Sequence, residues 1–151
     1  MSEKKRLTVS QAKKIAKACL KEFLGENDVI EKDGVICYRG PIYRRDYMLT
    51  FEEGFDENSM LLSIKRIPVT DDGVEDLDWI DELYACTYMN FFVDYLEGDD
   101  DIVYPFFKYN YWFSTLNSKS AFESIVEQAA ISEVSMCELV FQEVMRNYLE
   151  E

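Results

Sequence analysis

The sequence predicts an α+β fold, with an N-terminal helix, an antiparallel three-strand meander, a helix, two further antiparallel strands and a long C-terminal helix packed on the sheet. Apolar residues recur at helical spacing near both ends of the chain, and between residues 28 and 68 they alternate with polar residues. No internal repeat, low-complexity tract or linker divides the 151 residues. We therefore expect residues 1–151 to form a single domain around one core.

The first predicted element is a helix from about Val9 to Leu24. It begins after Thr8 in the pattern T-V-S-Q of a capping box, in which Thr8 satisfies a first-turn amide and Gln11 reaches back to the amide of Thr8. Gly25 supplies the stop. One face is expected to be apolar, and another carries a stripe of lysines four residues apart, namely Lys13, Lys17 and Lys21.

The meander follows between residues 28 and 68. Residues 29–32 and 35–39 flank Asp33-Gly34, which favours tight turns, so this segment is a short hairpin or a turn leading into a strand. Strands over about 43–51 and 60–67 continue the antiparallel order. The apolar residues expected on the buried face are Tyr47, Leu49, Phe51, Leu62 and Ile64.

The next elements are a second helix over about 75–90 and two strands. Residues 91–96 are apolar in both helical and strand registers, and we assign them as extended. The sequence E-G-D-D-D then forms a hairpin tip, and residues 102–113 form the last strand or strands. Pro105 indicates an edge position or a bulge, because proline cannot donate to a ladder.

A second capping box, Ser120-A-F-E, predicts the start of a C-terminal helix that runs to about Tyr148. Such a helix would approach about 40 Å, longer than a domain of this size needs to cover one sheet. A homodimer contact along its far half is the natural hypothesis, and a bend near residues 131–135 is the alternative. The expected apolar stripe is Phe122, Ile125, Val126, Ala129, Val134, Cys137, Val140, Phe141, Val144 and Tyr148.

The composition argues against several functional classes. Lys and Arg number 16 against 30 Asp and Glu, and the resulting charge of −14 repels a phosphate backbone, which predicts no nucleic-acid partner. The chain has no histidine, the commonest general base and zinc ligand. It also has no G-x-S-x-G, phosphate-loop or dinucleotide motif. We therefore expect no enzyme, no catalytic residue, no cofactor and no small-molecule substrate.

The sequence also argues against a metal site and against membrane contact. The acidic run at 97–101 does not match a calcium loop, so we interpret it as a solvated turn and expect no metal. The chain shows no apolar signal segment and no stretch of about 18 apolar residues, which predicts a cytoplasmic protein with no membrane contact. We interpret four widely spaced cysteines as structural, namely Cys19, Cys37, Cys86 and Cys137.

The densest feature is the aromatic run over residues 104–113. Alternate members of a strand face opposite sides of a sheet, so one set belongs to the core. The other set, including Tyr109 and Tyr111, is expected to form an exposed aromatic surface that binds a protein partner. Core packing of both sets is the favoured alternative. The candidate partner-binding residues are Tyr104, Phe106, Tyr109, Tyr111 and Trp112.

Four local features accompany the order of elements from Thr8 to Tyr148: E-K-D-G-V-I-C-Y, I-K-R-I-P-V, Y-M-N and an acidic turn before the final strand. With these features, the order of elements resembles the YbjN family. That family belongs to a wider group with the type III secretion chaperone-like fold. The resemblance implies a small acidic homodimer that binds an extended segment of a client protein on its sheet and helix surfaces. YbjN-like proteins are named as sensory transduction regulators, and the resemblance assigns no functional residue.

We therefore predict a non-catalytic protein-binding module, chaperone-like or regulatory, that acts as a homodimer. The alternative is an acidic inhibitor or immunity-type protein that neutralises a basic partner such as a nuclease. The charge is also polarised: residues 1–24 hold seven Lys or Arg and two acids, whereas residues 71–101 hold twelve acids and no Lys or Arg. We expect the lysine stripe to lie near that acidic surface, within a protomer or across a dimer, or to meet an acidic partner.

Overall fold

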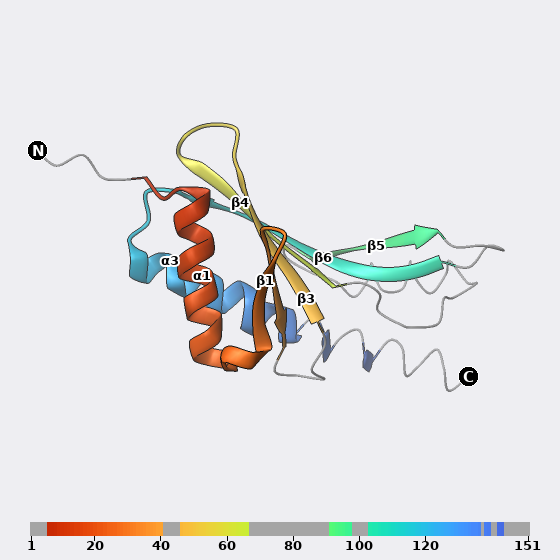
Figure 1. Ribbon diagram of the computed structural model, residues 1–151. Helices are drawn as coiled ribbons and strands as arrows, with labels where there is room; N and C mark the ends of the chain where they lie inside the picture. The colour runs from red at the N-terminus through yellow and green to blue at the C-terminus, as the bar shows by residue number, and fades with distance from the viewer. Residues whose placement is uncertain are drawn as a thin grey trace, which may run out of the picture.

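The computed structural model describes residues 6–40, 46–66, 91–97, 103–136, 138–139 and 142–143, and the side chains of 91–97 and 103–107 lie outside this description. The predicted α+β fold is confirmed (Figure 1). Six antiparallel strands form one sheet in the order β1-β2-β3-β4-β6-β5. The elements are α1 (Val9–Leu24), the 3-10 turn η1 (Glu26–Asp28), β1 (Val29–Lys32), β2 (Val35–Arg39), β3 (Asp46–Glu53), β4 (Ser59–Arg66), β5 (Phe91–Glu97), β6 (Val103–Ser114), α3 (Lys119–Glu127) and the π-helix η2 (Gln128–Glu133).

Helix α1 begins and ends as predicted. The Gln11 amide donates to the Thr8 hydroxyl at 3.1 Å, and the Thr8 amide donates to the Gln11 side chain at 3.0 Å, which completes the capping box. Gly25, at φ +104°, donates its amide to the Lys21 carbonyl and ends the helix. The turn that follows folds β1 back along α1 (Figure 1).

The β1–β2 hairpin is confirmed at Asp33-Gly34. Both residues have positive φ, at +54° and +81°, as the tight turn between antiparallel strands requires. Glycine adopts that conformation at little steric cost. Strand β3 then pairs with β2 over residues 46–49, and the predicted start of β3 at residues 43–45 lies outside the described residues.

The described helices all lie against one face of the sheet. The predicted inward set Tyr47, Leu49, Phe51, Leu62 and Ile64 is buried. Phe122 of α3 contacts the rings of Phe51 and Phe113 at centroid distances of 5.7 and 5.3 Å, and Ala12, Ala16 and Leu20 of α1 are fully buried. The core therefore lies between the two helices and the inward face of the sheet.

The predicted extended conformation of residues 91–96 is confirmed by β5, and residues 103–114 form one strand, β6. Pro105 pairs with Tyr95 in an unbroken register, so no bulge is present there. The β4–β6 pairing ends at Arg66 and Phe107. Within the described strands, only β5 therefore flanks Pro105, which agrees with an edge position.

The C-terminal helix begins two residues earlier than predicted. Its N-cap is Ser118, whose hydroxyl accepts from the Ala121 amide at 3.2 Å, so the predicted cap at Ser120 is wrong. The turn after β6, in which the Asn117 side chain donates to the Ser114 carbonyl, brings Ser118 into the extended conformation that a cap requires. Alpha-helical bonding gives way to a π-helix at Gln128–Glu133, close to the predicted bend. The predicted second helix and Cys86 and Cys137 lie outside the described residues.

Candidate functional site

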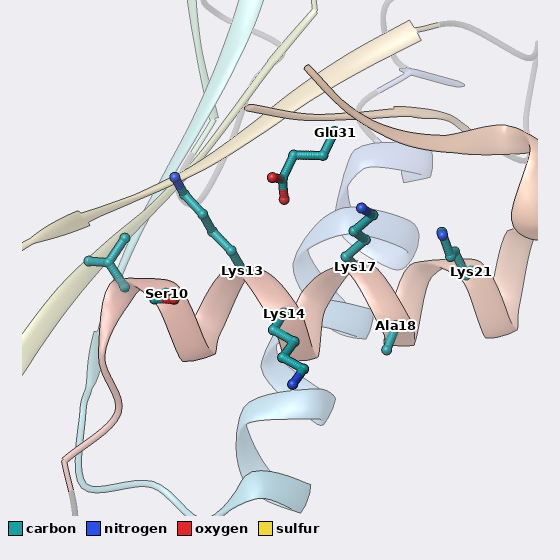
Figure 2. Close-up of a pocket in the computed structure, with 8 residues that line it drawn as sticks. Ser10, Lys13, Lys14, Lys17, Ala18, Lys21 and Glu31 are labelled. Atoms are coloured by element: carbon teal, nitrogen blue, oxygen red, sulfur yellow. The ribbon is translucent and has the colours of Figure 1, made fainter. Parts of the chain in front are cut away.

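A lysine-lined cavity lies beside α1, and we call it the lysine cavity. Its volume is about 770 Å³. Lys13, Lys17 and Lys21 project from one side of the helix towards β1, and Glu31 of β1 points back between Lys13 and Lys17, whereas Lys14 points the other way (Figure 2). The predicted lysine stripe therefore forms one wall of a cavity.

The opposite face of the sheet carries an exposed pair of aromatic rings, Phe55 and Trp112, which we call the aromatic pair. The rings stack with a centroid distance of 5.3 Å and an interplanar angle of 24°. Phe55 is 95% exposed and Trp112 is 48% exposed. Trp112 of β6 lies across from Leu61 of β4, which in turn lies across from Glu52 of β3. The aromatic pair therefore sits at one end of the sheet face that lies opposite the described helices.

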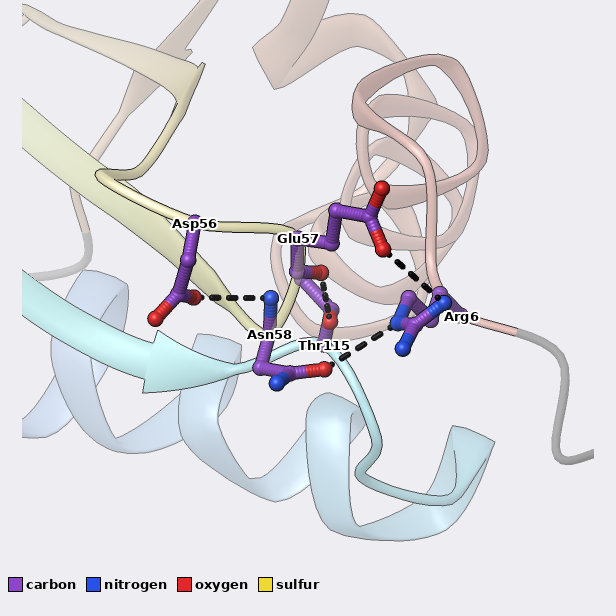
Figure 3. A network of polar contacts seen from close by, with 5 residues as sticks. All are labelled: Arg6, Asp56, Glu57, Asn58 and Thr115. Carbon is purple, nitrogen blue, oxygen red and sulfur yellow. Dashed lines mark hydrogen bonds and ion pairs between the residues drawn. The ribbon is translucent and has the colours of Figure 1, made fainter.

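Short polar contacts hold the loop that carries Phe55, as Figure 3 shows. The Thr115 hydroxyl donates to the Glu57 carbonyl at 2.7 Å, and the Asn58 amide donates to the Asp56 carboxylate at 2.8 Å. Arg6 donates to the Asn58 side chain at 3.0 Å and contacts the Glu57 carboxylate at 3.3 Å. This network joins the loop to β6 and to the segment before α1, so Phe55 projects from an anchored turn.

Gly54 is required at the base of the same loop. A Cβ at this position would lie 2.1 Å from the Ser59 hydroxyl oxygen and 2.8 Å from the Ser59 carbonyl oxygen. The Gly54 amide donates to that carbonyl at 3.1 Å, which closes the turn between β3 and β4. Only a residue without a side chain permits this close approach.

Four acidic residues lie within three positions of Phe55 in the chain, and we call them the acidic rim: Glu52, Glu53, Asp56 and Glu57. All four residues are exposed. Three of them, Glu53, Asp56 and Glu57, line a second cavity of about 520 Å³ beside Phe55. Among the described cations, Arg6 pairs with this rim, through Glu57. The site combines an apolar stacking surface with a negatively charged cavity.

The described members of the predicted aromatic surface lie on opposite faces of the sheet. Tyr109 is 2% exposed, so the expectation that it is exposed is wrong. Its register partner is the buried Ile64, which places Tyr109 on the helix-covered face, and Tyr111 follows it there, half-buried and stacked on Tyr109 at 6.3 Å. The side chains of Tyr104 and Phe106 lie outside the described residues, which leaves Trp112 as the exposed member of the predicted set.

A buried polar cluster of Tyr47, Arg66 and Glu138 was not predicted. Arg66 contacts the Glu138 carboxylate at 2.8 Å, and the Tyr47 hydroxyl donates to it at 2.8 Å. Burial and the Glu138 carboxylate raise the pKa of Tyr47. Two signals were present in the sequence: Arg66 continues the alternating inward set of β4, and Glu138 lies four residues after the buried Val134. Because all three side chains are buried, the cluster offers no surface to a ligand and its role is structural.

Other features of the described residues bear on metals, thiols and membranes. No described group of three or more His, Cys, Asp or Glu is placed to hold a metal ion. Cys19 is buried and Cys37 is half-buried, and both carry free thiols. No helix in this part of the chain is both long enough and apolar enough to cross a membrane.

Comparison with known proteins gives no relative from which a function can be transferred. The chain matches no family model, no curated protein and no solved structure. The resemblance to the YbjN family therefore stays a prediction, and the functional argument rests on the residues described above.

Proposed function

We propose that this protein is a non-catalytic protein-binding module, chaperone-like or regulatory in role, that acts as a homodimer and binds its partner at the aromatic pair. The observation that carries the proposal is the stacking of two large rings at 95% and 48% exposure, on the sheet face opposite the described helices. Aromatic side chains are enriched at protein interfaces and supply much of the binding energy there. The anchored loop places Phe55 before binding, which limits the ordering cost of association.

The acidic rim specifies the chemistry of the partner. Glu53, Asp56 and Glu57 line the cavity next to Phe55, so a lysine or arginine side chain fits there by charge. An apolar side chain of the same partner segment would cover the rings of Phe55 and Trp112. The proposed ligand is therefore a protein segment that carries apolar residues beside Lys or Arg.

The homodimer is supported by the outer side of the C-terminal helix. Met136 and Leu139 are 51% and 49% exposed, one helical turn apart. Residues three apart lie on the same helix face, so the two side chains form one apolar patch. This patch lies on the far half of the helix, where the length of the predicted helix indicates a dimer contact.

The acidic rim also supports the alternative of an acidic inhibitor that neutralises a basic protein such as a nuclease. In that case the carboxylates would carry the contact, and the aromatic pair would contribute little. Long-range attraction between charges depends strongly on salt, whereas apolar contacts do not. The two functions therefore differ in how substitutions of rings and carboxylates affect binding.

The test uses a fluorescein-labelled peptide of alternating Arg and Leu as the probe, with fluorescence anisotropy as the readout. Trp112→Ala should weaken binding about 30-fold, the loss typical of an aromatic hot spot. The matched control is Met48→Ala, because Met48 is 37% exposed on the same sheet face away from the aromatic pair. It should change the affinity by less than about twofold. Circular dichroism of both variants checks that the fold is retained.

Two results would overturn the proposal. If Trp112→Ala binds the peptide as tightly as the unchanged chain, the aromatic pair is not the anchor. If a peptide of alternating Arg and Ser binds as well as the Arg and Leu peptide, the charges alone carry the contact and the inhibitor alternative is favoured. Light scattering of Met136→Glu against the unchanged chain tests the dimer, and a monomeric unchanged chain at micromolar concentration would remove that part.

A further inference from the structure

We infer that the lysine cavity is a second binding surface, which takes an acidic peptide segment of a partner protein. The inference does not depend on the aromatic pair, because the two surfaces come from different elements and carry opposite charge. It rests on three observations: the lysines form no ion pair with a described residue, they repeat at a regular spacing, and Glu31 divides the cavity.

The lysines lie close together on α1 and form no ion pairs with described residues. This holds for Lys13, Lys14, Lys17 and Lys21. Like charges four residues apart on a helix repel each other and destabilise it. In a chain with a net charge of −14, a concentrated basic wall is best explained by an acidic ligand.

The spacing identifies the form of that ligand. Residues four apart on a helix are separated by about 6 Å along its axis. Alternate residues of an extended chain are separated by about 6.6 Å, and they point to the same side. Lys13, Lys17 and Lys21 therefore match carboxylates at every second position of an extended segment.

Glu31 argues against a single small anion in the cavity. Its carboxylate points between Lys13 and Lys17, so it repels an anion placed centrally between these two side chains (Figure 2). A row of separate carboxylates can meet each lysine on either side of Glu31. Lys13 is also directed towards the β1–β2 turn, where its Nζ lies 3.5 Å from the position that a Cβ on Gly34 would occupy. The cavity is consequently a groove with several contact points.

The test measures binding of a fluorescein-labelled peptide of alternating Glu and Ser by anisotropy in low salt. Lys17→Gln should weaken binding about fivefold, the effect of one contact between unit charges at 4 Å in water. Lys119→Gln is the matched control, because Lys119 is an exposed lysine at the start of α3 that does not line the cavity. Glu31→Gln should have the opposite effect and tighten binding. These residues lie at the surface, and circular dichroism checks that the variants keep their fold.

The outcomes separate this inference from its rivals. Equal losses for Lys119→Gln and Lys17→Gln would overturn it, because a general attraction to positive charge would then explain the binding. Competition by inorganic phosphate at the peptide's own concentration would assign the cavity to small anions, and tighter binding of a single-stranded oligonucleotide would assign it to nucleic acid. If the protein self-associates and Lys17→Gln abolishes this association, the occupant of the cavity is a second copy of the chain. Trp112→Ala should leave binding of the Glu and Ser peptide unchanged. The lysine cavity can therefore bind its ligand even if the proposed function of the aromatic pair is wrong.

Discussion

Replacing Glu138 with glutamine should destabilise the protein severely, because it removes the charge that compensates a buried arginine. Arg66 is 2% exposed and Glu138 is fully buried, with 2.8 Å between their charged groups. Removing one partner of a buried ion pair costs about 3–5 kcal/mol, because the remaining charge stays buried without its counter-ion. Glutamine retains the shape of the side chain, and its carbonyl oxygen still accepts the hydrogen bond from the Tyr47 hydroxyl. The loss of stability therefore comes from the missing charge.

The magnitude can be measured by urea unfolding and by thermal melting. For a chain of this size, a loss of 3–5 kcal/mol corresponds to a fall of about 6–20 °C in Tm. The double variant Arg66→Met, Glu138→Leu removes both charges and should be less destabilised than Glu138→Gln, because apolar pairs of similar volume often replace buried ion pairs without loss. It leaves the Tyr47 hydroxyl without this acceptor, at a cost of about 1–3 kcal/mol, so adding Tyr47→Phe should recover further stability.

Two results would refute this reasoning. A loss below about 1 kcal/mol for Glu138→Gln would mean that the Arg66 guanidinium is solvated and not buried with Glu138. The single variants Arg66→Met and Glu138→Leu complete the comparison. If the double variant loses as much stability as these two single variants together, the side chains are energetically independent. The urea m-value of each variant must match that of the unchanged chain, because a changed slope would indicate a different folded or unfolded state.

Three further predictions concern the helix cap, the tyrosines and the thiols. Thr8→Ala should lower the free energy of unfolding by about 1 kcal/mol in urea because it removes the α1 cap, and Thr8→Ser should restore most of it. Burial raises the pKa of Tyr38 and Tyr47 above the ordinary 10.0, so the unfolded chain loses these protons first and stability falls as pH rises above that value. In unfolding experiments, Tyr47→Phe should reduce this fall by about 1.4 kcal/mol in total between pH 9 and 11, and an unchanged fall would contradict the assignment. Burial also raises the pKa of the Cys19 thiol, so mass spectrometry after iodoacetamide treatment should find Cys37 modified first, and the reverse order would be a contradiction.

Local signals predicted most of the described fold. The capping box at Thr8 and the turn at Asp33-Gly34 each lie within a few neighbouring residues, so the sequence alone contains the whole interaction. The sequence S-K-S-A-F-E offers two serines within reach of a helix start. The choice of Ser118 over Ser120 depends on how the chain leaves β6, where Asn117 bonds to Ser114, and no helical periodicity encodes that turn.

The candidate sites were harder to predict because they depend on strand register and on distant contacts. Both alternating sets of the aromatic run are largely apolar, so the pattern does not show which set faces inward, and the pairing of Tyr109 with Ile64 decides it. Phe55 lies in the polar turn between β3 and β4, and its stacking on Trp112 joins this turn to the distant strand β6. Glu138 lies 91 residues from Tyr47, so only the folded sheet and helix bring their side chains together.

The buried polar cluster also bears on the proposed dimer, because it fixes how the C-terminal helix is rotated against the sheet. Glu138 meets Arg66 only when its side of the helix faces β4, and that rotation leaves the neighbouring Met136 and Leu139 about half exposed. A rotation by one residue would place Leu139 against Arg66 and leave the guanidinium buried beside an apolar side chain, which is strongly unfavourable. The buried charge therefore specifies which apolar residues face outward. If Met136 and Leu139 form the dimer contact, Glu138→Gln should weaken dimerisation even though Glu138 itself never reaches the surface.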